Sequence, residues 1–151
     1  MDTFAHAFWS YIIFHQSEYV WLAVLFGVLP DLLSWTIYSI YPKKKEFNWK
    51  KPNFDLIPNW VFTLYGITHS LCVITFVFSI VFIIFQQIPI FLFAWPLHVL
   101  IDIPTHKKDF LPTPFLWPFS KYAFPGISWG TKKFTIANYS LIILFLIYIL
   151  F

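Results

Sequence analysis

Residues 19–41 read YVWLAVLFGVLPDLLSWTIYSIY, an apolar stretch that contains one carboxylate, Asp31, directly after Pro30. At about 1.5 Å of rise per residue, a helix of this length can cross the roughly 30 Å hydrocarbon core of a bilayer. We expect the proline to kink the helix just before the carboxylate, because proline has no N–H and its ring clashes with the preceding turn. The stretch therefore predicts a membrane-spanning helix that carries a buried acid.

Four further apolar segments surround this stretch: residues 3–14, 58–85, 88–103 and 134–151. The first is about 18 Å long as a helix, which is short for a span. Only Gln86 and Gln87 separate the third and fourth segments of the chain, which predicts a tight helical hairpin. We expect an all-α fold, a polytopic membrane helix bundle with four spanning helices and a short N-terminal helix. Residues 1–151 would form a single integral membrane domain.

The composition supports a membrane protein. Hydrophobic residues make up 59% of the chain, charged residues 11%, and the mean hydropathy is +0.70. Soluble domains average about 45–50% apolar and about 25% charged residues. The net charge of +3 lies in loops beside apolar segments, so it is not the signature of a nucleic-acid-binding protein.

All positive side chains of the chain are lysines, and they lie in two regions, residues 43–51 and 107–133. Lysine-rich loops stay on the cytoplasmic side of a membrane. We therefore expect a multi-pass protein of the inner (cytoplasmic) membrane with both lysine regions and Met1 on the cytoplasmic side. The turns at residues 15–18 and 86–87 and the C-terminus would lie on the opposite side.

Five ionisable side chains interrupt the apolar segments at a similar depth in the cytoplasmic half of the bilayer: His6, Asp31, His69, His98 and Asp102. An ionised Asp in mid-helix costs about 2.5–3.5 kcal/mol, so it needs a partner. No lysine or arginine is available inside these segments, and a divalent cation is the obvious counter-charge. We predict these five residues as metal ligands, with Zn²⁺ as the ion, although Mn²⁺ and Fe²⁺ also suit the set.

Other polar residues near this set each allow two interpretations. His106 is an additional ligand or a solvated loop histidine. Asp2 repeats, with His6, the i, i+4 spacing of His98 and Asp102, or it is only a helix N-cap. Hydroxyl or amide side chains that could orient ligands, or serve only the helices, are Thr68, Ser70, Thr105 and Asn138. The whole set could also be a buried polar network that holds the bundle together.

Five motifs occur in order along the chain: MDTFAHA (1–7), GVLPD (27–31), THSL (68–71), HVLIDIPTH (98–106) and TPFLWPFS (113–120). This ordered set resembles the YdjM-like family of membrane-bound metal-dependent hydrolases of bacterial inner membranes. That family is distantly similar to zinc-dependent phospholipase C and P1-type nucleases. The resemblance implies that His6, Asp31, His69, His98 and Asp102 are ligand positions, and it suggests a phosphoester substrate.

The chain departs from that family at two places. Leu33 stands where many relatives carry a second acid, and Leu64-Tyr65-Gly66 stands where many carry His-Arg-Gly. Fewer ligands favour one or two metal ions rather than three.

The leading functional hypothesis is a metal-dependent hydrolase that cleaves an ester or phosphoester of a membrane lipid or another amphiphile. Asp31 or Asp102, whichever is not a ligand, would act as the catalytic general base, and the lysines of the second loop could attract an anionic substrate. A divalent-ion transporter or channel is the first alternative, although transport needs polar lining across the whole bilayer. A structural membrane protein stapled by a metal ion is the second.

Overall fold

The computed structural model describes residues 1–41 and 54–151, and the lysines at positions 43–51 lie outside this part. The described residues form helices and no β-strand, which confirms the all-α prediction. The elements are α1 (Thr3–Phe14), α2 (Val20–Asp31), η1 (Leu32–Thr36), α3 (Ile37–Ile40), η2 (Phe54–Leu56), α4 (Asn59–Thr68), α5 (Leu71–Phe85), η3 (Ile90–Phe93), α6 (Ala94–Thr105) and α7 (Lys132–Leu150).

The second apolar segment forms one continuous helical rod, Val20–Ile40, made of α2, η1 and α3. Pro30 lies inside α2, and the turn that follows, η1, widens into a π-helix. The Ser34 hydroxyl donates to the Pro30 carbonyl at 2.9 Å. The disturbance expected at the proline therefore takes the form of a widened turn, which begins directly after Asp31.

The third apolar segment is not one straight helix. The axes of α4 and α5 differ by 55°, and the break lies at His69 and Ser70. Ser70 is the N-cap of α5, because its Oγ accepts the N–H of Val73 at 3.2 Å. On the α4 side, the Trp95 indole donates to the Thr68 carbonyl at 2.7 Å. Contacts from other elements thus replace the helical hydrogen bonds at the break.

Two helices are long and apolar enough to cross a membrane, Val20–Ile40 and Lys132–Leu150. The bent pair of α4 and α5 makes a third if it counts as one span. The segment Ile90–Thr105 is apolar but shorter, about 24 Å long at the α-helical rise. Of the four spans expected, the described residues thus give two or three, because one segment is bent and another is too short.

Large apolar side chains lie exposed on the outer faces of α5 and α7: Phe76, Ile83, Ile84, Phe85, Leu144, Ile147, Tyr148 and Leu150. Monomeric soluble proteins rarely expose apolar area on this scale. Inside, one apolar cluster joins α1 to α7 through Met1, Ala5, Ile12 and Ile142, and another comprises Tyr38, Ile57 and Val61.

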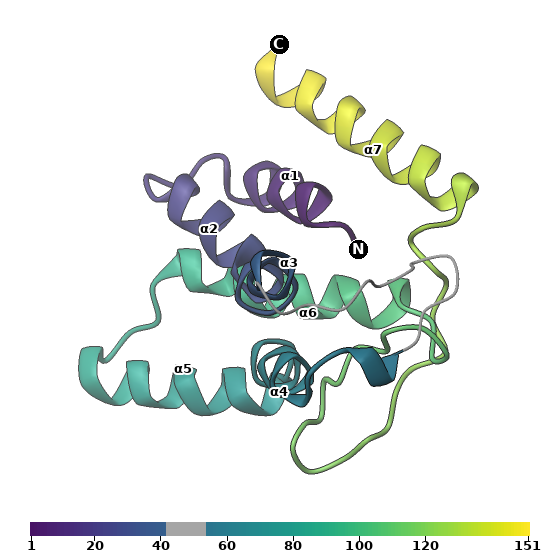
Figure 1. Cartoon of the computed structure of the whole chain (residues 1–151). Coiled ribbons are helices and arrows are strands. Elements are labelled where there is room, and N and C mark those ends of the chain that lie inside the picture. The colour runs from purple at the N-terminus through teal and green to yellow at the C-terminus, as the bar shows by residue number, and fades with distance from the viewer. Residues whose placement is uncertain (42–53) are drawn as a thin grey trace.

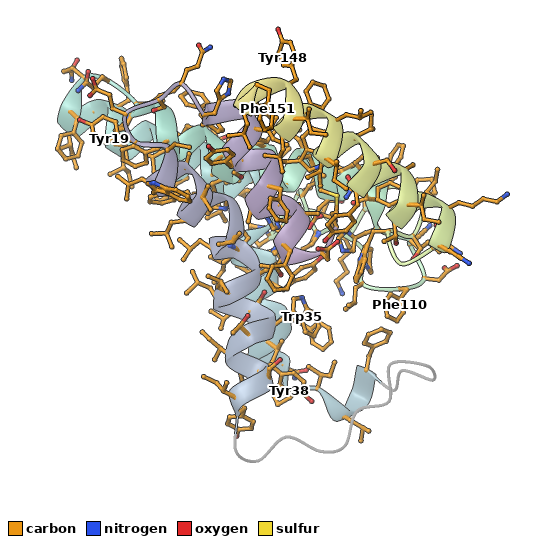
Figure 2. The ribbon with its side chains drawn as sticks, turned by 90° about the horizontal axis from the view of Figure 1, so that it is seen from above. Tyr19, Trp35, Tyr38, Phe110, Tyr148 and Phe151 are labelled. Carbon is orange, nitrogen blue, oxygen red and sulfur yellow. The ribbon has the colours of Figure 1, made fainter. Side chains whose placement is uncertain are left out.

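The helices are arranged so that the short turns gather at one end of the molecule. The α1–α2 turn and the α5–α6 turn both lie at the left in Figure 1, and the long loop between α6 and α7 lies at the opposite end. Figure 2 shows the far half of the α2–α3 rod, with Trp35 and Tyr38, projecting away from α1 and α7. This arrangement brings the ends of α1, α2, α4 and α6 together around one buried site.

Candidate metal centre

Four ionisable side chains from three parts of the chain converge in the interior. Asp31, His69, His98 and Asp102 are buried, and each offers one ligand atom within 4.8 Å of the others. Asp31 ends α2, His69 lies at the α4–α5 break, and the other two lie one turn apart on α6. This group could hold a metal ion.

A backbone carbonyl fixes the orientation of His98. Its Nδ1 lies 2.6 Å from the carbonyl oxygen of Gly27. A carbonyl can only accept, so Nδ1 carries the proton, and Nε2 of the neutral ring has a free lone pair. Nε2 lies 3.3 Å from Oδ2 of Asp102. Histidines that bind metals are commonly held in this way through the other ring nitrogen.

His69 is oriented in the same way, by a backbone carbonyl that faces its Nδ1. Its Nδ1 lies 3.1 Å from the Tyr65 carbonyl, and its Nε2 lies 3.1 Å from Nε2 of His98. When both rings are in the neutral form, as metal ligation requires, their Nε2 lone pairs face each other, with Oδ1 of Asp31 3.7 Å and Oδ2 of Asp102 3.6 Å from His69 Nε2. Four acceptors facing one point repel one another unless a positive charge lies between them. A divalent ion bonded to all four would remove this conflict.

The two carboxylate oxygens of Asp102 have different surroundings. Oδ1 accepts from Nε2 of His6 at 2.9 Å and also contacts the amino group of Met1. Oδ2 is buried and has no hydrogen-bond partner among the described residues. A buried polar atom without a partner is costly and calls for an explanation. Because Oδ2 belongs to the converging group, a bound cation fits as its missing partner.

Asp31 is oriented from α1. The Thr3 hydroxyl donates to its Oδ2 at 2.8 Å, which leaves Oδ1 on the side of the histidines. The sequence interpretation missed Thr3. The signal was available, since Thr3 precedes His6 by three residues and therefore lies on the same face of the helix.

His6 lies beside the group of four rather than within it. Its ring stacks on that of His98 with centroids 3.6 Å apart, and its Nε2 bonds Asp102. In this position His6 contacts both His98 and Asp102 and stabilises their orientation. Its assignment as a direct ligand stays a prediction.

His106 is not a solvated loop residue, because it is buried at the C-terminal end of α6. Its Nδ1 lies 3.1 Å from the Asp102 carbonyl and 3.5 Å from Oδ1 of the same residue. Burial lowers the pKa of His106 to about 4, so the ring is neutral at pH 7. Nδ1 then donates to the carbonyl, and Nε2 is left as an acceptor.

Asp2 and Asn138 serve the packing of α1. Asp2 is its N-cap, with Oδ1 accepting from the N–H of Ala5 at 3.0 Å and from the hydroxyl of Tyr139 at 2.7 Å. Asn138 accepts from the Trp9 indole at 3.0 Å. The Tyr139 and Asn138 contacts join α1 to α7, and no hydrogen bond found among the described residues connects Asn138 to the four-residue group.

The hydroxyl residues considered as supports have different roles. Thr68 Oγ1 lies 3.0 Å from His69 Nδ1, so it contacts a candidate ligand. Ser70 caps α5. Thr105 donates to the Ile101 carbonyl within its own helix, at 3.0 Å.

A cavity of about 430 Å³ reaches the centre from one side. Asp31 and His106 lie in its wall, together with Met1, Asp2, Thr3, Trp35, Tyr65, Phe110, Leu111, Ser128, Trp129 and Gly130. Ligand sites typically have volumes of about 300–1,000 Å³ and combine apolar walls with a few polar groups. The aromatic wall was not predicted, because its members lie far apart in the sequence.

Comparison of the chain with protein-family models, with curated proteins and with solved structures finds no match.

Proposed function

We propose that this chain is a membrane-embedded hydrolase that uses a divalent metal ion, Zn²⁺ first among the candidates, to cleave an ester or phosphoester of an amphiphile. The observation that carries the proposal is the convergence of two oriented imidazoles and two carboxylates beside a cavity. Two histidines and two carboxylates suit Zn²⁺, which takes nitrogen and carboxylate ligands in a four-coordinate site. The YdjM-like family suggested by the motifs is consistent with this activity.

The four residues would hold a divalent ion, which would supply Lewis-acid chemistry, the polarisation of an ester oxygen and a lowered pKa of a water. The residues supply the rest. His69 and His98 keep their Nε2 atoms on the centre through carbonyl bonds from Nδ1. Of the two carboxylates, Asp31 lines the cavity, so we propose that it gives up its place on the ion to the attacking water and takes the proton of that water as general base. His69, His98 and Asp102 would then hold the ion, which is the number of protein ligands typical of catalytic zinc sites. The water oxygen bonds to phosphorus or to the acyl carbon, the ester bond breaks, and the departing alcohol oxygen takes the proton.

The site and the lysine-bearing loop after α6 would face the cytoplasm, by the positive-inside rule. A membrane lipid is the substrate source that the exposed apolar faces favour, with the anionic phosphoester group placed at the centre.

The alternatives make different demands on the structure. An ion path needs polar groups through the whole bilayer. A groove of about 680 Å³ between α1, α5 and α6 has Thr75 and Ser79 as the only polar residues in its described lining. A metal staple would have closed coordination, whereas Asp31 here lines an open cavity. Both observations favour an enzyme.

The test combines metal analysis with a substrate screen. The protein is purified in maltoside, stripped with a chelator, reloaded with Zn²⁺, Mn²⁺ or Fe²⁺, and assayed on nitrophenyl esters, phosphate monoesters and phosphodiesters. We expect metal-dependent hydrolysis that is lost, with the metal, in His98→Ala. His15→Ala is the matched control, since His15 caps the end of α1 away from the site. Stoichiometric metal without hydrolysis of any ester would favour the staple.

A further inference from the structure

Tyr65 of α4 connects the metal centre to the cavity beside it. Its ring packs on the ring of His69 with centroids 4.1 Å apart, and its backbone carbonyl lies 3.1 Å from Nδ1 of the same histidine. The residue is buried, and it lines the cavity of about 430 Å³ together with Asp31. The phenol is therefore fixed relative to a candidate ligand and to the proposed general base.

The hydroxyl of Tyr65 is only weakly bonded within the protein. Its contact with the Leu111 carbonyl is 3.5 Å long, whereas O–H···O hydrogen bonds usually measure about 2.7–2.8 Å. The buried Thr113 hydroxyl lies beside the phenol oxygen and has no other partner among the described residues. Because Thr113 can donate to that oxygen, the proton of Tyr65 stays available for a better acceptor than Leu111.

The backbone that faces this hydroxyl is strained. Leu111 has a φ of 49°, in the left-handed region that bulky residues rarely adopt. Such a conformation persists only where the surrounding structure imposes it, and it is found most often at functional sites. Leu111 lines the same cavity as Tyr65. The strain is thus a second, independent indication that this part of the wall binds a ligand.

Two other donors in the wall of the cavity are already engaged. The Thr3 hydroxyl donates to Oδ2 of Asp31, and the Met1 amino group contacts Oδ1 of Asp102. We infer that the Tyr65 hydroxyl donates a hydrogen bond to the ester or phosphoester oxygen that gains negative charge during cleavage, and is thus a catalytic residue. The hydroxyl keeps its proton throughout. The inference rests on the proposed function for the reaction, whereas the hydrogen bond to a bound oxyanion can be measured without cleavage.

The first test is the kinetics of Tyr65→Phe, which keeps the ring on His69 and removes the hydroxyl. In the Zn²⁺-reloaded protein we expect kcat to fall about 100-fold, the usual effect of losing one donor to a developing oxyanion. KM should stay within about threefold, because the bond strengthens in the transition state, and zinc content should not change. Tyr11→Phe is the matched control, since Tyr11 packs against Trp21 and does not line the cavity.

The second test is the binding of butylphosphonate, a stable tetrahedral anion, titrated by calorimetry into the same Zn²⁺-loaded samples. We expect Tyr65→Phe to bind it about tenfold more weakly than the wild type and Tyr11→Phe, because a hydrogen bond to a charged group is lost. Equal kcat and equal phosphonate affinity in Tyr65→Phe and wild type would overturn the inference. Loss of zinc from Tyr65→Phe would also overturn it, because Tyr65 would then serve only to support His69.

The two readouts separate this inference from the proposed function. Phosphonate binding that depends on zinc and on the Tyr65 hydroxyl, in a protein that cleaves no ester, would support the donor and refute the hydrolase. Ester hydrolysis with the same kcat in wild type and Tyr65→Phe would refute the donor and leave the hydrolase standing.

Discussion

Among single residues, Thr3 is the one whose role in the centre is most easily isolated. Its hydroxyl bonds Oδ2 of Asp31 at 2.8 Å, and valine has nearly the same shape without the hydroxyl. We expect Thr3→Val to weaken Zn²⁺ binding about 10–100-fold, the usual effect of losing a group that orients a ligand. Thr3→Ser, which keeps the hydroxyl, should stay within a few-fold of the wild type. Competition with a chromophoric chelator measures both, and equal affinity in Thr3→Val and wild type would contradict the role.

His6 can be tested by separating its hydrogen bond from its capacity to bind a metal. Its Nε2 bonds Oδ1 of Asp102, and a glutamine amide can reach a similar position as a donor. If His6 supports Asp102, His6→Gln should keep zinc affinity within about tenfold of the wild type, while His6→Ala should lose about 10–100-fold. The chelator competition again supplies the measurement. An equally severe loss in both variants would favour His6 as a direct ligand.

The sequence could indicate which side chains of the centre meet, but not how they are held. Spacing within apolar segments singled out Asp31, His69, His98 and Asp102, and the structure brings their ligand atoms together. The groups that orient the two imidazoles are backbone carbonyls, of Gly27 among others. Every residue carries such a carbonyl, so no residue type marks the one that will accept the bond.

Among the helices, α1 and α2 depend on a close approach at Gly27. A Cβ there would overlap the Ser10 hydroxyl and lie 2.9 Å from the Ser10 Cβ. In an open helix Gly→Ala is stabilising by about 0.5–1 kcal/mol, but here we expect Gly27→Ala to destabilise by about 1–3 kcal/mol through overpacking. Denaturant unfolding in micelles measures the change.

A second substitution tests the cause. Ser10→Ala removes the overlapping oxygen but not the Cβ, so it should recover part of the stability lost in Gly27→Ala. Gly130→Ala is the control, since a Cβ there meets only the Ser128 hydroxyl at an ordinary 3.8 Å. A neutral Gly27→Ala would show that α1 and α2 can separate without cost.

Element boundaries followed from local sequence except where distant contacts decide them. The first two segments, expected at 3–14 and 19–41, form α1 at Thr3–Phe14 and the rod Val20–Ile40. The break inside 58–85 was not foreseen, because its hydrogen bonds come from outside the segment: the Trp95 indole to the Thr68 carbonyl, and the N–H of Leu71 to the Phe115 carbonyl. Hydropathy alone cannot report a bend that other parts of the chain stabilise.

For the whole molecule, the open question is how the bent pair sits in the bilayer. We take both lysine-bearing loops to be cytoplasmic. If α4 and α5 together cross the bilayer, the α5–α6 turn then lies on the side opposite to the loop after α6. If the pair enters and returns, both lie on one side. The two loops lie at opposite ends of the molecule in Figure 1, which favours crossing. The short segment Ile90–Thr105 would then have to meet a locally thinned bilayer.

Labelling of single cysteines in intact cells decides between these arrangements. The native Cys72 is first replaced by serine, and Gln87→Cys or Lys121→Cys is introduced at an exposed position in each loop. Because lysine-rich loops stay in the cytoplasm, an impermeant maleimide should label position 87 in intact cells and position 121 only after the membrane is opened. Labelling of both positions in intact cells would place the loop after α6 outside the cytoplasm and would contradict the predicted orientation. Protection of both positions in intact cells would mean that the bent pair is re-entrant and that both loops lie in the cytoplasm.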